Sequence, residues 1–182
     1  MIGEPAVFWS SLAGAFACAV AGAWLFQRDD ARPGRSVVLL ALGASALWGV
    51  LTAAMGADSS AAALAETVRN LAWLAFVHNL ITGGGRLSGI AGARPVLLVL
   101  ACVELLHPVL RITIANALPA HPLQNVAFEL TVLLRLLVVV GGLVLVQNVY
   151  GLERQRGRSA LRWNAAALGA VWLCDQIGRA HV

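Results

Sequence analysis

Hydrophobic side chains fill six long stretches of this chain, and polar residues gather in the short segments between them. The stretches cover residues 6–26, 36–55, 61–81, 95–112, 125–150 and 160–175. An α-helix needs about 20 residues to cross the hydrocarbon layer of a bilayer, because each residue advances the helix by ~1.5 Å. The first five stretches are close to that length or longer, and the sixth is shorter. The pattern therefore predicts an all-α, polytopic transmembrane helix bundle of about six helices, the sixth incomplete.

The overall composition favours the same environment. Of the 182 residues, 59% are hydrophobic and 12% are charged, and the mean hydropathy is +0.79. Soluble domains carry about 25% charged residues, which cover their surface in water. A charged fraction of half that value is typical of a protein whose outer side chains contact lipid. We therefore expect this chain to be embedded in the lipid bilayer, which is its main partner.

The arginines follow a regular rule along the chain. Eight of the thirteen lie in the first, third and fifth segments between the hydrophobic stretches: Arg28, Arg32, Arg35, Arg86, Arg94, Arg154, Arg156 and Arg158. The second segment has none, and the fourth has only Arg111 at its edge. Short loops on the cytoplasmic side of a membrane protein are enriched in Arg and Lys. The pattern predicts a multi-pass protein of the bacterial inner (plasma) membrane with its N-terminus outside. Because the arginines lie in separate short loops, no nucleic-acid partner is expected.

The last six residues, 177–182, read Ile-Gly-Arg-Ala-His-Val. A widely used sequencing adapter encodes this peptide in one reading frame, directly before a stop codon. We therefore expect residues 177–182 to be adapter read-through and to say nothing about the fold. Residues 1–176 are then the N-terminal multi-helix membrane region of a longer natural protein.

Small residues recur at every fourth position in the first two stretches. They are Ser10, Gly14, Cys18 and Gly22 in the first, and Ala41, Ser45, Gly49 and Ala53 in the second. Such a stripe lets two helix backbones approach closely in lipid. We expect the first two helices to pack tightly against each other.

Ionisable residues also occur inside the hydrophobic stretches. Each costs about 2.5–3.5 kcal/mol at the centre of a span, so each is expected to have a partner. Glu66 and Arg69 are three residues apart and share one helix face, as do Glu104 and His107. We predict one intramembrane polar network between the third, fourth and fifth helices, formed by Glu66, Arg69, Asn70, Glu104, His107, Glu129 and Arg135.

Two interpretations of this network stay open. The polar pairs orient the helices, or they form a pocket that senses a ligand or a proton. No catalytic, metal or cofactor-binding residue is predicted, because the cluster offers no nucleophile and no second metal ligand of the usual kind. Pro108, directly after His107, either kinks the fourth helix or ends it.

Four short motifs together resemble the membrane region of one protein family. They are SALW at 45–48, ETVRNLAWL at 66–74, VQNVY at 146–150 and LRW at 161–163. The family comprises the PEP-CTERM/exosortase-associated sensor histidine kinases, and the resemblance covers residues 1–176. Cys174 stands before Asp175 where the family tends to have Tyr, and Gly151 follows Tyr150 where Arg is common.

The resemblance implies a membrane-embedded sensor that controls a cytoplasmic kinase of a two-component system, in exopolysaccharide and PEP-CTERM protein-sorting regulation. It implies a homodimer, a cognate response regulator as partner, and ATP as the cofactor of a kinase domain that this chain does not include. No cofactor is expected for residues 1–176 themselves. A cytoplasmic kinase also requires at least one further span after the sixth. The residues leave two alternatives open: a small transporter or channel subunit, and a structural membrane protein.

Overall fold

The computed structural model describes residues 3–28, 34–57, 59–82, 93–116 and 123–155, and every element within these ranges is an α-helix. The helices are α1 (Gly3–Gln27), α2 (Arg35–Met55), α3 (Ser60–Thr82), α4 (Ala93–Asn116) and α5 (Leu123–Gln155). The predicted all-α fold is therefore confirmed for the described part of the chain. The sixth predicted helix (160–175) and the segment 177–182 lie outside the described residues.

Each of the first five hydrophobic stretches becomes one helix, with ends displaced by a few residues from the predicted ones. One difference concerns α4, which continues through Pro108 to Asn116. The interpretation of Pro108 as a helix end is therefore wrong. Proline has no backbone N–H, so the carbonyl of Glu104 one turn earlier receives no helical hydrogen bond from position 108.

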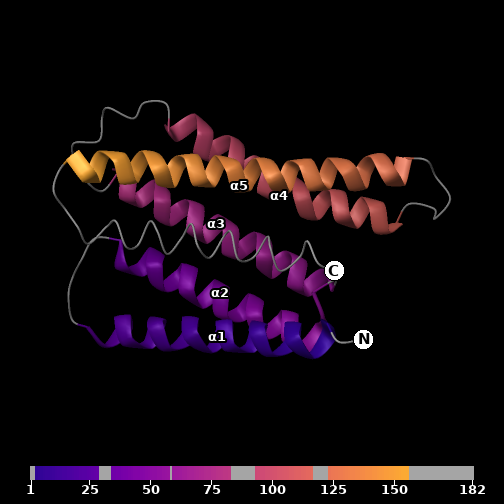
Figure 1. Cartoon of the computed structure of the whole chain (residues 1–182), viewed down its shortest axis with the longest axis horizontal. Coiled ribbons are helices and arrows are strands. Elements are labelled where there is room, and N and C mark those ends of the chain that lie inside the picture. Colours follow the sequence, from indigo (N-terminus) through magenta and orange to yellow (C-terminus); the bar gives the residue numbers. More distant parts are fainter. Residues whose placement is uncertain (1–2, 29–33, 58, 83–92, 117–122, 156–182) are drawn as a thin grey trace.

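The helices form an antiparallel up-and-down array (Figure 1). Each helix packs on the next one along the chain, and α3 also touches α5. Contacts between α1 and α2 show the register: Gly22 lies against Leu42, whereas Gly49 lies against Ser11 and Ala15. Because the contact position moves backwards along α1 as it moves forwards along α2, the two helices run in opposite directions.

The α1–α2 interface is close enough to exclude a side chain at Gly49. A Cβ atom built there would stand 2.8 Å from the carbonyl oxygen of Ser11 and 2.9 Å from the Cβ of Ala15. The predicted tight packing of the first two helices is thus confirmed. The register differs from the predicted stripe, since a Cβ at Gly14 would meet no atom within 4 Å. Ser11 and Ala15, not Gly14, face Gly49.

The hydrophobic core joins the last three described helices. Its buried residues are Leu74, Phe76, Val77, Ile81, Leu97, Leu100, Val138 and Leu145. Leu100 of α4 is 2% exposed and fills the space at Gly141 of α5, where a Cβ would come within 2.6 Å of the Leu100 Cδ2. The core uses the second half of α3 and the first half of α4, so it lies towards one end of the array.

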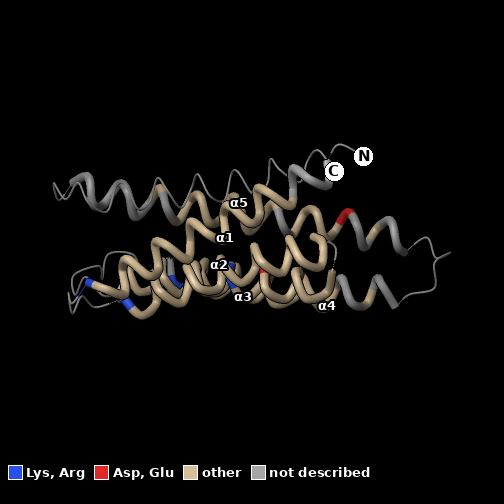
Figure 2. The backbone as a smooth tube through the Cα atoms, turned by 90° about the horizontal axis from the view of Figure 1, so that it is seen from below, with Lys and Arg blue, Asp and Glu red and all other residues tan. Residues whose placement is uncertain are grey.

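Arginines gather at this same end. Arg28 follows α1, Arg35 begins α2, and Arg94 is the second residue of α4. The antiparallel array brings these three helix ends together, and Figure 2 shows the described basic positions displaced towards the end where α1 stops and α2 starts. We call it the arginine end.

Two helices are long and apolar enough to cross a membrane by length and composition: Phe8–Gln27 within α1, and α2 from Arg35 to Met55. Both are near the N-terminus, where a pair of such helices is a weak indication of membrane association. The sequence predicts six spans; within the described ranges, these two helices meet the criteria of length and apolar composition.

Candidate functional site

A group of polar side chains is buried between α3 and α4. Glu66 and Arg69 on α3 are 6% and 4% exposed, and Glu104 and His107 on α4 are 6% and 8% exposed. Asn70, half-buried, lies between the two helices beside them. Buried ionisable groups are stable only when they are hydrogen-bonded or paired. We call Glu66, Arg69, Asn70, Glu104 and His107 the polar cluster.

Asn70 connects the two helices by donating and accepting at once. Its Nδ2 donates a hydrogen bond to Oε1 of Glu104 at 3.0 Å, across the α3–α4 interface. Its Oδ1 accepts hydrogen bonds from Nε of Arg69 at 3.3 Å and from Nη2 of Arg69 at 3.2 Å. The side-chain amide therefore links a guanidinium on one side to a carboxylate on the other, which also defines which of its atoms is the oxygen.

Arg69 extends the cluster to a further helix. Its guanidinium carbon lies 3.9 Å from the centre of the Trp48 ring on α2. A cation over the face of an indole ring is attracted by the ring's quadrupole, most strongly where water is excluded. The sequence predicts a network shared by the third, fourth and fifth helices; the described contacts instead run from α2 through α3 to α4.

A second polar contact joins α2 and α3 one turn away. Nε1 of Trp73 donates a hydrogen bond to Oγ of Ser45 at 3.1 Å, and this hydroxyl donates in turn to the carbonyl of Ala41 at 2.8 Å. Ser45 and Trp48 are three residues apart on α2, while Arg69 and Trp73 are four apart on α3. The two helices therefore present one polar group and one tryptophan each, and each tryptophan contacts the polar group of the other helix.

Sequence reasoning missed Ser45 and Trp48 as members of this site. Both stand in the SALW motif, and Arg69, Asn70 and Trp73 stand in ETVRNLAWL. A tryptophan within a turn of a small polar residue, repeated in two consecutive hydrophobic stretches, is the signal that could have identified the pair. Indole N–H groups need a hydrogen-bond acceptor when they are buried, so a buried tryptophan itself indicates a nearby polar atom.

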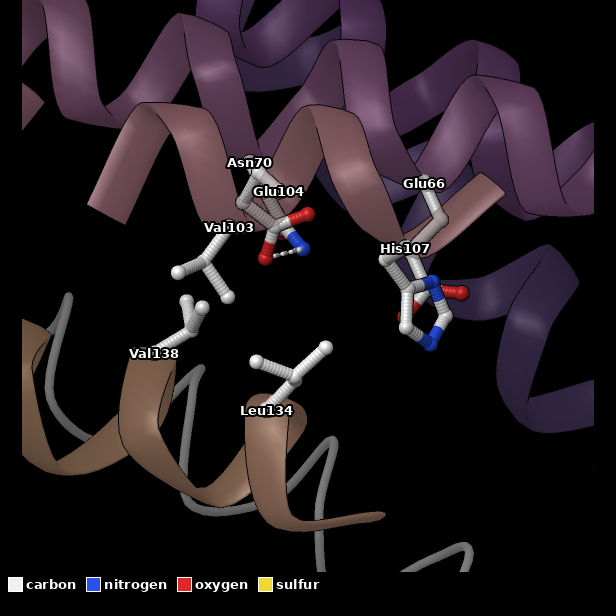
Figure 3. Close-up of a pocket in the computed structure, with 7 residues that line it drawn as sticks. All are labelled: Glu66, Asn70, Val103, Glu104, His107, Leu134 and Val138. Carbon is white, nitrogen blue, oxygen red and sulfur yellow. Dashed lines mark hydrogen bonds between the residues drawn. The ribbon is translucent and has the colours of Figure 1, made fainter. Parts of the chain in front are cut away.

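A small cavity lies beside the cluster (Figure 3). Its lining consists of Glu66, Asn70, Val103, Glu104, His107, Leu134 and Val138. The hydrogen-bonded pair of Asn70 and Glu104 is at one end, Glu66 and His107 are at the other, and α5 contributes two aliphatic side chains to the lining. The space open to the centre of a water-sized sphere is ≈ 10 Å³. This is room for about one water molecule.

The two remaining predicted members come from α5. Glu129 is exposed and is not part of the cavity lining, so the structure does not bring it into the cluster. The side chain of Arg135 lies outside the described residues. The α5 residues that do reach the cavity, Leu134 and Val138, are apolar. Both interpretations of the polar cluster, a sensing pocket and a set of pairs that only orient the helices, stay predictions.

The chemistry open to the cluster is proton exchange and the hydrogen bonding of a very small ligand. Carboxylates and imidazole exchange protons readily, and the described residues of the lining include no hydroxyl or thiol that would act as a nucleophile. In the described part of the chain no group of three or more His, Cys, Asp and Glu side chains is arranged to hold a metal ion. Comparison of the chain with protein families, with characterised proteins and with solved structures gives no match.

Proposed function

We propose that this chain is the membrane-embedded sensory part of a two-component sensor histidine kinase, acting in exopolysaccharide and PEP-CTERM protein-sorting regulation. The observation that carries the proposal is the connected series Trp48–Arg69–Asn70–Glu104, which joins three helices inside an otherwise apolar array. Polar residues buried between membrane helices commonly mark functional positions. Two of the motifs that resemble the sensor kinases, at 45–48 and 66–74, supply three of these four residues.

Membrane insertion of all the described helices is the first part of the proposal. Large apolar side chains point outwards on every helix, among them Phe16 on α1 (72% exposed), Leu98 on α4 (67%) and Leu133 on α5 (64%). Soluble monomers rarely expose apolar surface on this scale, and lipid would cover it. The arginine end faces the cytoplasm in this arrangement, and the N-terminus lies outside.

The mechanism follows from how the α3–α4 interface is divided. Near the arginine end it is apolar, with Leu74, Phe76 and Leu100 in the core. In the other half it holds the polar cluster and the cavity. A cavity leaves side chains room to rearrange, whereas close-packed aliphatic side chains have almost none. A signal that changes the contacts of the cluster would therefore alter the angle between α3 and α4, with the apolar half of the interface as the pivot. The protein would shift its population between two such helix arrangements.

The output in this scheme passes through α5, which packs on α4. It has 33 residues, which corresponds to about 50 Å of helix. The hydrocarbon layer is about 30 Å thick, so α5 would extend beyond it. Its last turn is at the arginine end, where the proposal places the cytoplasm. The remaining partners are a second copy of the chain and a response regulator, which would be reached through a kinase domain that also binds ATP; no residue here is assigned to ATP.

Reading the gene past residue 176 tests the function most directly. A downstream kinase core with a phosphoacceptor histidine and an ATP-binding domain is the expected result. Further hydrophobic stretches that run to a natural stop codon, without a kinase, would overturn the proposal. Reporter fusions test the orientation: a fusion within residues 83–94 should be cytoplasmic and a fusion at residues 56–59 should be outside.

A small transporter or channel subunit is the second candidate, favoured by the cavity lined with two glutamates and a histidine. Ionisable groups inside spans also mark proton and ion pathways. This candidate predicts flux: vesicles that contain the protein would pass protons or a small solute, and Glu104→Gln would stop the flux. If the chain is a sensor, the same vesicles should pass neither protons nor the solute.

A further inference from the structure

The small cavity beside the polar cluster has a size and a lining that together define what it can bind. We propose that it binds one water molecule, which bridges the Asn70–Glu104 pair and the Glu66–His107 pair and so completes the polar half of the α3–α4 interface. The binding of the water does not depend on the proposed function. Its role as a replaceable contact in signalling rests on that function.

The two polar pairs lie about one helix turn apart. Asn70 of α3 is bonded to Glu104 of α4. In an antiparallel pair of helices, one turn back along α3 corresponds to one turn forward along α4, which brings Glu66 to the level of His107. Figure 3 shows the two pairs at opposite ends of the cavity.

This separation matches the reach of one bridging water. Glu66 and Asn70 are four residues apart on α3, and Glu104 and His107 are three apart on α4. These spacings correspond to about 4.5–6 Å along the helix axes. Two hydrogen bonds that meet at one water oxygen, each of about 2.8 Å, span up to about 5.6 Å. A water between the pairs can therefore reach both of them.

The volume of the cavity excludes larger ligands. The space open to the centre of a water-sized sphere is ≈ 10 Å³. This is about the smallest space that holds a water molecule, and an organic ligand does not fit in it. In the part of the chain that the structure describes, no group of three or more His, Cys, Asp and Glu side chains is arranged to hold a metal ion.

The lining offers both donors and acceptors to a water. Its polar members are Glu66, Asn70, Glu104 and His107. A buried water typically makes about two to four hydrogen bonds. A carboxylate accepts up to about four hydrogen bonds and a side-chain amide donates two. The contacts that these side chains make with other groups therefore leave them able to bond to a water as well.

A dry cavity is the alternative. Cavities lined only by aliphatic side chains stay empty, because they offer a water no hydrogen bond. Here the aliphatic members Val103, Leu134 and Val138 form one part of the lining, and polar side chains form the other. Buried polar groups are more stable when hydrogen-bonded, which favours a water in this space. The two alternatives predict opposite results when the space is filled.

A substitution that fills the cavity tests the occupant. Val138 is 7% exposed and lines the cavity, and Val138→Ile adds about the volume of one water molecule. A methyl group that displaces a bound water cannot replace its hydrogen bonds, so the thermal unfolding temperature of the full chain in lipid nanodiscs should fall. In a dry cavity the same methyl group would fill a void and raise it. Val140→Ile, at a position that is 49% exposed on the same helix, should leave it unchanged.

Overpacking would also lower the unfolding temperature, so the bound water is counted directly. Relaxation dispersion of oxygen-17-labelled water counts the water molecules that stay bound to the protein, and exchange of protein protons does not contribute to the oxygen signal. We expect Val140→Ile to bind as many waters as the unmodified chain and Val138→Ile to bind one fewer. Equal numbers in all three proteins overturn the proposal, and so does a higher unfolding temperature of Val138→Ile.

Two further measurements cover the case in which Val138→Ile does not fold, as judged by circular dichroism. Val103→Leu fills the same space from α4, where Val103 is half-buried, and it should also bind one water fewer than the unmodified chain. A density map of the unmodified chain that shows ordered waters needs no variant. It should contain one water within hydrogen-bond distance of both polar pairs, and a map without that water overturns the proposal.

The water site and the proposed function can fail separately. If the water is present and the gene lacks a kinase after residue 176, the water site stands and the sensor function fails. If the gene encodes a kinase and the water is absent, the sensor function stands and the water site fails.

Discussion

The Asn70 amide and the Glu104 carboxylate form a 3.0 Å hydrogen bond that joins α3 to α4 within the polar cluster. On the α3 side the same amide accepts from Arg69, which lies on Trp48 of α2. One short side chain thus connects the contacts of three helices. Replacing Asn70 should therefore weaken the contacts of all three helices.

Asn70→Leu removes both hydrogen-bonding functions while nearly keeping the volume. We expect it to lower the free energy of unfolding by about 1–3 kcal/mol, because a buried carboxylate and a guanidinium lose a partner. Val68→Ala, at an exposed position on the same turn, is the control and should change little. Unfolding in mixed detergent micelles, followed by circular dichroism, measures both. Equal effects of the two substitutions would show that the bond to Glu104 contributes nothing.

Trp48 and Trp24 form a matched pair, since each lies against an arginine. The Arg69 guanidinium is 3.9 Å from the Trp48 ring centre and buried, whereas Arg28 is 3.8 Å from the Trp24 ring centre and exposed. Cation–π attraction reaches about 2 kcal/mol when water is excluded and about 0.5–1 kcal/mol when it is not. Trp48→Leu should therefore destabilise the protein clearly more than Trp24→Leu. Thermal melting of both variants decides the point, and a larger effect at Trp24 would contradict it.

The α1–α2 contact depends on the missing side chain at Gly49. Gly49→Val should separate the two helices, because a Cβ would stand 2.8 Å from the backbone oxygen of Ser11, which cannot yield as a flexible side chain would. Gly14→Val serves as the control, since no atom lies within 4 Å of that position. Protease sensitivity of the 29–33 segment and thermal stability are the measurements. Intact stability of Gly49→Val would refute this register.

At the α4–α5 contact the neighbour of the glycine is a side chain, which permits rescue. Gly141→Ala should destabilise the array by about 1–3 kcal/mol through overpacking against Leu100, whose Cδ2 would lie 2.6 Å from the new Cβ. Adding Leu100→Val should recover part of this loss, so the double variant is less destabilised than the sum of the single ones. Gly43→Ala, with open space around it, is the control. Additive effects in the double-mutant cycle would show that positions 100 and 141 do not meet.

Local patterns in the sequence determined the five helices and their approximate ends, because hydrogen bonding along a helix and its length depend on neighbouring residues. The alternation of arginine-rich segments likewise determined that Arg28, Arg35 and Arg94 lie at one end, once the helices alternate in direction. Spacing also identified Glu66, Arg69, Glu104 and His107 as two polar faces, and these four are buried together.

Only the tertiary structure decided which groups meet across the helices. The sequence does not reveal that Arg69 lies on Trp48, that Trp73 bonds to Ser45, or that Glu129 faces outwards. The physical reason is that these helices are hydrophobic on nearly all sides, so hydrophobicity does not mark the buried face. Which partner a side chain finds then depends on the rotation and register of one helix against another, and both are set by close packing at points such as Gly49 and Gly141.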